Sequence, residues 1–193
     1  MPAPRDVAVL VGSLRKASWT RLVAVALSRL APPTLKLEIV EIGDLALYNQ
    51  DFDDEHRVPA PWQTFRDRIA RADAVLFATP EYNRSVPSVL KNAIDVGSRP
   101  YGKSAWNGKP AAVVSVSPGA LSAFGANHHL RQSLVFLNMP TLQQPEVYIG
   151  GVNHLVDAEG KILKPETKQF LETFLAAFAT WIEATRSLAP KER

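Results

Sequence analysis

Apolar residues along this chain fall into two kinds of stretch that alternate with each other. Short stretches that are apolar throughout or at every second position predict buried strands, and they cover 6–11, 35–42, 74–78, 111–116 and 141–149. Longer stretches with helical spacing or helix-end signals cover 19–30, 62–71, 87–96, 123–137 and 165–188. This alternation predicts an α/β fold, in which a five-stranded parallel sheet carries helices on both faces.

Turn-forming residues separate these stretches. Ser18 precedes the first predicted helix as a candidate N-cap, and Pro87 stands in the first turn of another helix, where its missing N–H costs nothing. Pro145 interrupts the fifth predicted strand. Residues 43–60 are acidic and rich in turn formers, so we expect them to cross the surface, with 51–55 as a solvated loop rather than a metal site.

Composition adds limits on the chemistry. The 193 residues, 46% of them apolar, suit one domain over 1–193 with a frayed tail at 189–193. The net charge is +3, and the lysines and arginines are spread along the chain without forming a stripe, so we expect no nucleic-acid partner. A weak positive field still favours anionic ligands. Without cysteine there are no disulfides or thiolate sites, and redox chemistry requires a cofactor.

The start of the chain does not read as a signal peptide, and no stretch has the roughly 20 apolar residues that cross a bilayer. We therefore expect a cytoplasmic protein with no membrane partner.

Open parallel sheets bind ligands beyond the carboxyl ends of their strands, near the point where strand order reverses. The loop after the first strand, 12–18, is the first place to look. Ser13 and Ser18 supply hydroxyls, Arg15 supplies a charge, and the N-terminus of the following helix, with Thr20 just inside it, supplies N–H groups for a phosphate. The alternative is an ordinary N-cap beside surface basic residues. The loop matches neither the Walker pattern nor GxGxxG.

The loops after the third and fourth strands favour a planar ligand. Pro80, Glu81, Tyr82, Asn83 and Arg84 combine a stiff backbone with a flat ring and an amide, which suits packing beside a heterocycle. The alternative is a well-packed turn before a helix. In the next loop, Ser117 and Gly119 leave room for a ligand near the backbone, and a plain turn is the alternative. Together the three loops outline a site for a mononucleotide with a large flat head.

Three segments carry a resemblance to a known family. They are 12–18 (GSLRKAS), 80–87 (PEYNRSVP) with 90–95 (LKNAID), and 129–132 (HLRQ). With these, the chain from about 6 to 185 resembles the NADPH-dependent FMN reductases, which include quinone and chromate reductases. The resemblance implies a five-stranded flavodoxin-like fold that binds FMN, and a homodimer or homotetramer with flavin sites near the subunit contacts.

The resemblance also assigns residues. It places Ser13, Arg15, Ser18 and Thr20 on the phosphate, Pro80, Glu81, Tyr82, Asn83 and Arg84 beside the isoalloxazine, and Ser117 and Gly119 in the third loop. Two departures stand out. Trp19-Thr20 replaces the family's frequent Phe-Asn, and Ser122-Ala123 with Gly125 replaces a common Gly-Gly pair with an Arg two positions on. The second departure bears on how closely the third loop approaches the flavin.

The expected function is that of an FMN-dependent oxidoreductase. It takes electrons from NADPH or NADH and passes them to a small acceptor: a quinone, a free flavin, an azo compound or an oxidised metal such as chromate. The cofactor supplies the chemistry, so no catalytic side chain and no metal are predicted. The alternatives are a flavodoxin-type electron carrier to a protein partner, although flavodoxins are usually acidic, and a ligand-binding domain without a redox role.

A few conspicuous residues receive plainer interpretations. We expect His128 and His129 to have structural or interface roles, because neighbours in a helix point in different directions. Trp106 lies in the turn-rich stretch 100–108, which makes it a candidate for lining an acceptor pocket besides the usual packing role of tryptophan.

Overall fold

The computed structural model describes residues 3–186. The strands are β1 (Arg5–Val11), β2 (Leu35–Val40), β3 (Ala74–Thr79), β4 (Ala111–Val116) and β5 (Val147–Ile149). The helices are α1 (Trp19–Leu30), α2 (Asp51–Asp54), α3 (Ala60–Arg71), α4 (Ser88–Gly97), α5 (Phe124–Phe136), the short 3₁₀ turn η1 (Val152–His154) and α6 (Pro165–Thr185). The predicted end of the last helix at 188 and the predicted frayed tail at 189–193 lie outside the described residues.

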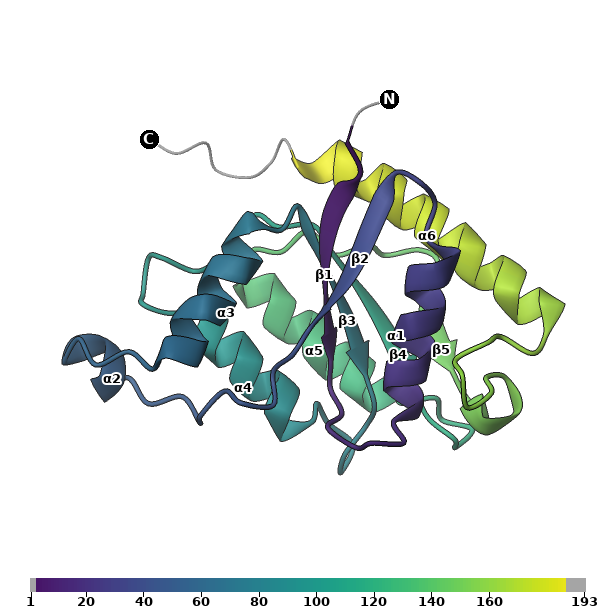
Figure 1. The fold of residues 1–193 in the computed structure, drawn as a ribbon, viewed down its shortest axis with the longest axis horizontal. Coiled ribbons are helices and arrows are strands. Elements are labelled where there is room, and N and C mark those ends of the chain that lie inside the picture. Colours follow the sequence, from purple (N-terminus) through teal and green to yellow (C-terminus); the bar gives the residue numbers. More distant parts are fainter. Residues whose placement is uncertain (1–2, 187–193) are drawn as a thin grey trace.

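The five strands form one parallel sheet in the order β2-β1-β3-β4-β5. Helices α1 and α6 cover one face, and α3, α4 and α5 cover the other (Figure 1). The predicted α/β architecture is therefore confirmed. Strand order reverses between β1 and β3, which is the switch point of this topology.

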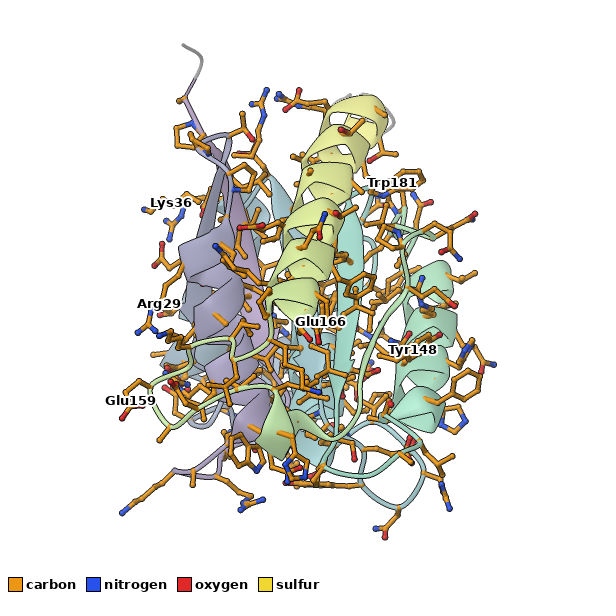
Figure 2. The ribbon with its side chains drawn as sticks, turned by 90° about the vertical axis from the view of Figure 1, so that its right-hand side faces the viewer. Arg29, Lys36, Tyr148, Glu159, Glu166 and Trp181 are labelled. Atoms are coloured by element: carbon orange, nitrogen blue, oxygen red, sulfur yellow. The ribbon has the colours of Figure 1, made fainter. Side chains whose placement is uncertain are left out.

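Each central strand is buried on both sides, and alternate residues feed two separate cores. In β1, Val7 and Val9 pack with α1 and α6, whereas Ala8 and Leu10 pack with α3 and α4. This explains why the strand segments are apolar without interruption: neither face meets water. Figure 2 shows α1 and α6 on one face, where the Arg29 guanidinium donates to the carbonyl of Glu159 at 2.8 Å and ties α1 to the segment before α6.

The predicted start of the fifth strand is wrong. The sequence pattern places it at 141, but β5 begins at Val147. Thr141 forms only an isolated bridge with Ala111, and Pro145 has no N–H to give a ladder. The second strand also ends two residues before the predicted 42, although Ile42 remains buried.

The acidic segment 43–60 packs against α3 through specific side-chain contacts. It contains α2, and the expectation of a solvated loop at 51–55 is wrong for Asp53, whose carboxylate is buried and receives two hydrogen bonds from Arg66, at 2.7 and 2.8 Å. Trp62 donates to the carbonyl of Ala46 at 3.0 Å. Side chains from α3 thus hold the segment at two points.

None of the helices within residues 3–186 has the length and apolar character needed to cross a membrane.

Candidate functional site

The loops that follow β1, β3 and β4 lie at one edge of the sheet, where its parallel strands end (Figure 1). We call this the carboxyl edge. Residues 12–18, 80–87 and 117–123 are the first, second and third loops. The edge includes the switch point between β1 and β3.

The first loop opens onto the N-terminus of α1. The Ser18 Oγ accepts a hydrogen bond from the N–H of Arg21 at 3.2 Å, so Ser18 is the N-cap predicted from the sequence. The N–H groups of Trp19 and Thr20 have no acceptor within residues 3–186. Such free N–H groups at a helix start form an anion site.

The basic side chains near this helix start differ in whether they have an acidic partner. Arg21 pairs with Glu41, and the hydrogen bond from Arg21 lowers the pKa of the Glu41 carboxyl. Arg15 is exposed and forms no ion pair within the described chain. A hollow of about 230 Å³ lies beside the loop, lined in part by Ser13, Arg15 and Lys16. The cationic groups left available here are therefore Arg15 and Lys16.

The second loop is built on a tight turn. The N–H of Tyr82 donates to the carbonyl of Ser85 at 3.1 Å, and the Ser85 N–H donates back at 3.0 Å. Asn83 and Arg84 between them both have positive φ, 50° and 65°, as in a type I′ turn. Their two N–H groups have no acceptor within residues 3–186, and the Tyr82 ring is exposed. The turn thus presents adjacent backbone donors beside an aromatic ring.

The first and second loops touch at Gly12. Its N–H donates to the carbonyl of Ala78 at 2.8 Å. A Cβ placed on Gly12 would lie only 3.1 Å from Cδ of Pro80 and 3.2 Å from Cδ2 of Leu90. A side chain here would require Pro80 or Leu90 to shift by a few tenths of an ångström, so glycine favours the close approach of the two loops.

The third loop keeps a backbone that glycine would adopt most easily. Ser122 and Ala123 both have positive φ, 55° and 58°, at the positions where the family commonly has a Gly-Gly pair. The left-handed conformation costs a non-glycine residue roughly 1–2 kcal/mol. The Ser115 Oγ offsets part of this cost by donating to the Ser122 carbonyl at 2.8 Å.

The front of the third loop lies against the end of β5. Ser117 donates from its N–H to the carbonyl of Ile149 at 2.8 Å, and its Oγ accepts from the Gly119 N–H at 3.0 Å. A Cβ on Gly150 would lie 2.3 Å from the Ser122 Oγ. Gly150, which sequence reasoning missed, therefore makes the fold of this loop possible.

The Glu81 side chain points away from solvent. Its carboxylate accepts a hydrogen bond at 3.0 Å from the N–H of Ala126, in the first turn of α5. The second loop is thereby joined to the helix that follows the third loop.

Asn92 is a second residue that sequence reasoning left without a role. It lies in α4 within the 90–95 motif and is buried. Its amide donates to the carbonyls of Leu45 and Ala46 at 3.0 Å, and its Oδ1 accepts from the N–H of Tyr48 at 2.8 Å. The signal in the sequence is an asparagine among apolar residues of a predicted helix. Such a residue, once buried, needs hydrogen-bond partners from another segment.

The packing role expected for Trp106 is confirmed, and the alternative that it lines an acceptor pocket is wrong. Its ring is fully buried, packs against Phe65 and Phe77, and donates from Nε1 to the carbonyl of Ile94 at 2.9 Å. Gly97 makes room for it, because a Cβ there would lie 2.5 Å from the indole. The turn-rich surroundings of Trp106 in the sequence gave no sign of this long-range packing.

The two histidines contact different neighbours. His129 Nδ1 lies 3.0 Å from the Oγ of Ser85 at the end of the second loop. His128 Nε2 lies 3.1 Å from the hydroxyl of Tyr148, which stands beside α5 at the sheet's outer edge (Figure 2). Tyr148 donates its one proton to Glu146, at 2.9 Å, so the His128 nitrogen is the donor in the other contact. Burial, helped by the Glu146 hydrogen bond, raises the pKa of Tyr148 to about 12.

Sheet order and loop placement define the class of this protein. A parallel sheet with this strand order, and loops at the carboxyl edge that expose backbone donors, is a flavodoxin-like nucleotide-binding fold.

Comparisons with known proteins narrow the class. The family model described as NADPH-dependent FMN reductase matches residues 5–154. A quinone reductase of Pseudomonas putida is 63% identical over 95% of this chain and 97% of its own. A 2-hydroxy-1,4-benzoquinone reductase of a Burkholderia species is 43% identical over 93% and 97%. The solved structure of a flavoenzyme NAD(P)H:(acceptor) oxidoreductase from Paracoccus denitrificans superimposes with a TM-score of 0.88, at 41% identity over 94% and 98% of the two chains.

The chain belongs to the NADPH-dependent FMN reductase family. It is an enzyme that uses FMN to pass electrons from a reduced nicotinamide to a small acceptor. The predicted family, activity and cofactor are thereby confirmed.

Proposed function

We propose that FMN lies across the carboxyl edge, with its phosphate at the first loop and its isoalloxazine beside the second. Within residues 3–186 the N–H groups of Trp19 and Thr20 have no acceptor and Arg15 has no ion pair, and these groups carry the phosphate part of this proposal. The adjacent N–H groups of Asn83 and Arg84 fit the polar edge of a ring. Ser13, Ser18 and Thr20 shape the phosphate end, while Pro80, Tyr82, Ser117 and Gly119 bound the space for the ring.

Bound at these loops, FMN would supply the redox chemistry, which is the transfer of two electrons from the nicotinamide to the acceptor. The chain's part is to bind and to orient. Helix α1 directs its positive end at the phosphate, and the turn at Asn83 and Arg84 holds donors in place without reorganisation. No side chain is assigned a proton-transfer role.

We further propose that quinones are acceptors. Two relatives that match this chain over almost their whole lengths are named as reductases of quinones. An exposed tyrosine, Tyr82, next to the proposed flavin position suits a flat acceptor.

The test is a visible spectrum of the purified protein without oxygen. We expect flavin absorption that bleaches on addition of NADPH and returns on addition of 1,4-benzoquinone. Flavin absorption that survives NADPH would favour an electron carrier reduced by a protein partner. Protein that remains colourless after incubation with FMN would refute the proposed site. Repeating the titration with NADH gives the donor preference.

Arg15→Ala is expected to weaken FMN binding roughly tenfold or more, because a charge-assisted hydrogen bond contributes about 1.5–3 kcal/mol. Fluorescence quenching of FMN by the apoprotein measures the dissociation constant. Arg71→Ala is the matched control, since Arg71 is also exposed but ends α3 just before β3 begins, at the sheet edge opposite the first loop. Equal affinity of Arg15→Ala and wild type would remove Arg15 from the phosphate site.

We also propose that the protein assembles as a homodimer or homotetramer. Val135 and Phe136 at the end of α5 are 79% and 80% exposed, and Tyr101, which lines a hollow together with Phe136, is 88% exposed. Bare apolar side chains of this size favour burial by a second copy. Sedimentation velocity of the wild type and of Phe136→Glu tests this, with a smaller species expected for the variant. The cytoplasmic location remains a prediction for cell fractionation.

A further inference from the structure

Helix α5 begins without a cap of its own. The residue at its N-cap position is Ala123, which has no side-chain acceptor and has a left-handed backbone. The first N–H groups of a helix have no partner inside the helix, and a side chain at the N-cap normally accepts from the second or third of them. In α5 the third is the N–H of Ala126.

Glu81 supplies this missing acceptor from the second loop. Its Oε2 accepts from the Ala126 N–H at 3.0 Å, although the two residues are 45 positions apart. Its side chain is only 13% exposed. A negative charge at a helix N-terminus is also favoured by the helix dipole. The other carboxylate contact, with Arg84 at 3.8 Å, is long and involves a guanidinium that is 75% exposed, so it contributes little.

Gly125 makes this capping possible. A Cβ at this position would lie 2.8 Å from the carbonyl oxygen of Arg84 and 3.0 Å from the Oε2 of Glu81. The first turn of α5 therefore touches the second loop with no space for a side chain. The residue that departs from the family's common Arg is the one that permits this contact.

From these two observations we propose that Glu81 is a positioning residue and not a ligand of the flavin. Its carboxylate fixes the second loop on α5, and this holds the turn at Asn83 and Arg84 with its free N–H groups directed at the ring. The inference rests on the proposed FMN site. It assigns the effect of Glu81 to hydrogen-bond acceptance, so an uncharged acceptor of the same shape replaces it.

Three variants test this role. Glu81→Gln keeps an acceptor oxygen and loses the charge, Glu81→Ala loses both, and Gly125→Ala keeps Glu81 but forces the helix from the loop. For each we would measure the FMN dissociation constant of the apoprotein and the two-electron midpoint potential of the bound flavin. Far-UV circular dichroism of each apoprotein verifies folding.

We expect Glu81→Gln to bind FMN within about twofold of wild type, and Glu81→Ala and Gly125→Ala to bind roughly fivefold more weakly, since a capping bond contributes about 1 kcal/mol. Because the loosened turn loses its donors to the reduced flavin, the potential should fall in these two variants and not in Glu81→Gln. Stability alone would not move the potential.

Two results would overturn the positioning role. If Glu81→Gln is as defective as Glu81→Ala in affinity and potential, the charge itself acts on the flavin. If Glu81→Ala matches wild type, the cap has no effect on the site. Both differ from failure of the proposed function, in which the wild-type protein itself would not bind FMN. Should Gly125→Ala fail to fold, the comparison of the two Glu81 variants still decides the question.

Discussion

Replacing Gly12 by valine is expected to lower FMN affinity by roughly 5- to 150-fold, because overpacking by a side chain costs about 1–3 kcal/mol at the contact that sets the geometry of two loops. The new Cβ would lie 3.1 Å from Cδ of Pro80 and 3.2 Å from Cδ2 of Leu90, and the γ-methyl groups would extend further. Neither neighbour yields easily, because Pro80 is a rigid ring and Leu90 is fully buried. The second loop would therefore move away from the first.

Gly43→Val is the matched control for this experiment. Gly43 also follows a strand, β2, and a Cβ there would lie 3.1 Å from Cδ2 of Leu14. Leu14 is 60% exposed, so the end of its side chain moves aside without displacing the backbone. We expect FMN affinity within about threefold of wild type for this control, since exposed side chains change rotamer at little cost. Equal affinities for both variants would show that contact between the first two loops is unimportant for the cofactor.

Local pattern was sufficient for much of the fold. Helix α1 begins and ends at the predicted residues, and β4 does so as well. In these elements all local signals agree: the apolar spacing, the N-cap at Ser18 and the breaks at glycine or proline. Agreement of this kind leaves one favoured local structure. The strand order, and hence the position of the site, then follows from the general behaviour of parallel sheets and not from any single residue.

Contacts between distant segments could not be predicted in this way. The sequence indicates that Glu81 lies in the second loop, but not that its carboxylate caps a helix 45 positions later. It likewise indicates that 51–55 is acidic, but not that one of these carboxylates is buried on α3. Which carboxylate is buried depends on how the segments pack. The sequence also left the pocket role of Trp106 open beside packing, because the space that it fills is created by Gly97 in α4.

The ion pair between Asp53 and Arg66 leads to the largest expected change in stability. Arg66→Met should lower the free energy of unfolding by about 3–5 kcal/mol, because it leaves a buried carboxylate without a partner. The Arg66 guanidinium donates to both oxygens of Asp53, at 2.7 and 2.8 Å, and to the carbonyl of Val96 at 2.9 Å, with both side chains under a tenth exposed. It also stacks over Trp62, with 5.5 Å to the ring centroid. Urea unfolding followed by circular dichroism measures the change.

The comparison that isolates burial uses an exposed pair in the same segment. Arg57 bonds Glu55 through Nε and Nη2, but both side chains are more than half exposed, so Arg57→Met should cost less than about 1 kcal/mol. Removing both charges with Asp53→Leu and Arg66→Met should recover much of the loss, since well-packed apolar residues often replace buried pairs without penalty. Similar losses in the single and double variants would mean that Arg66 stabilises the fold through Val96 and Trp62 rather than through Asp53. In that case α2 is held by its own packing, and the acidic segment is independent of this pair.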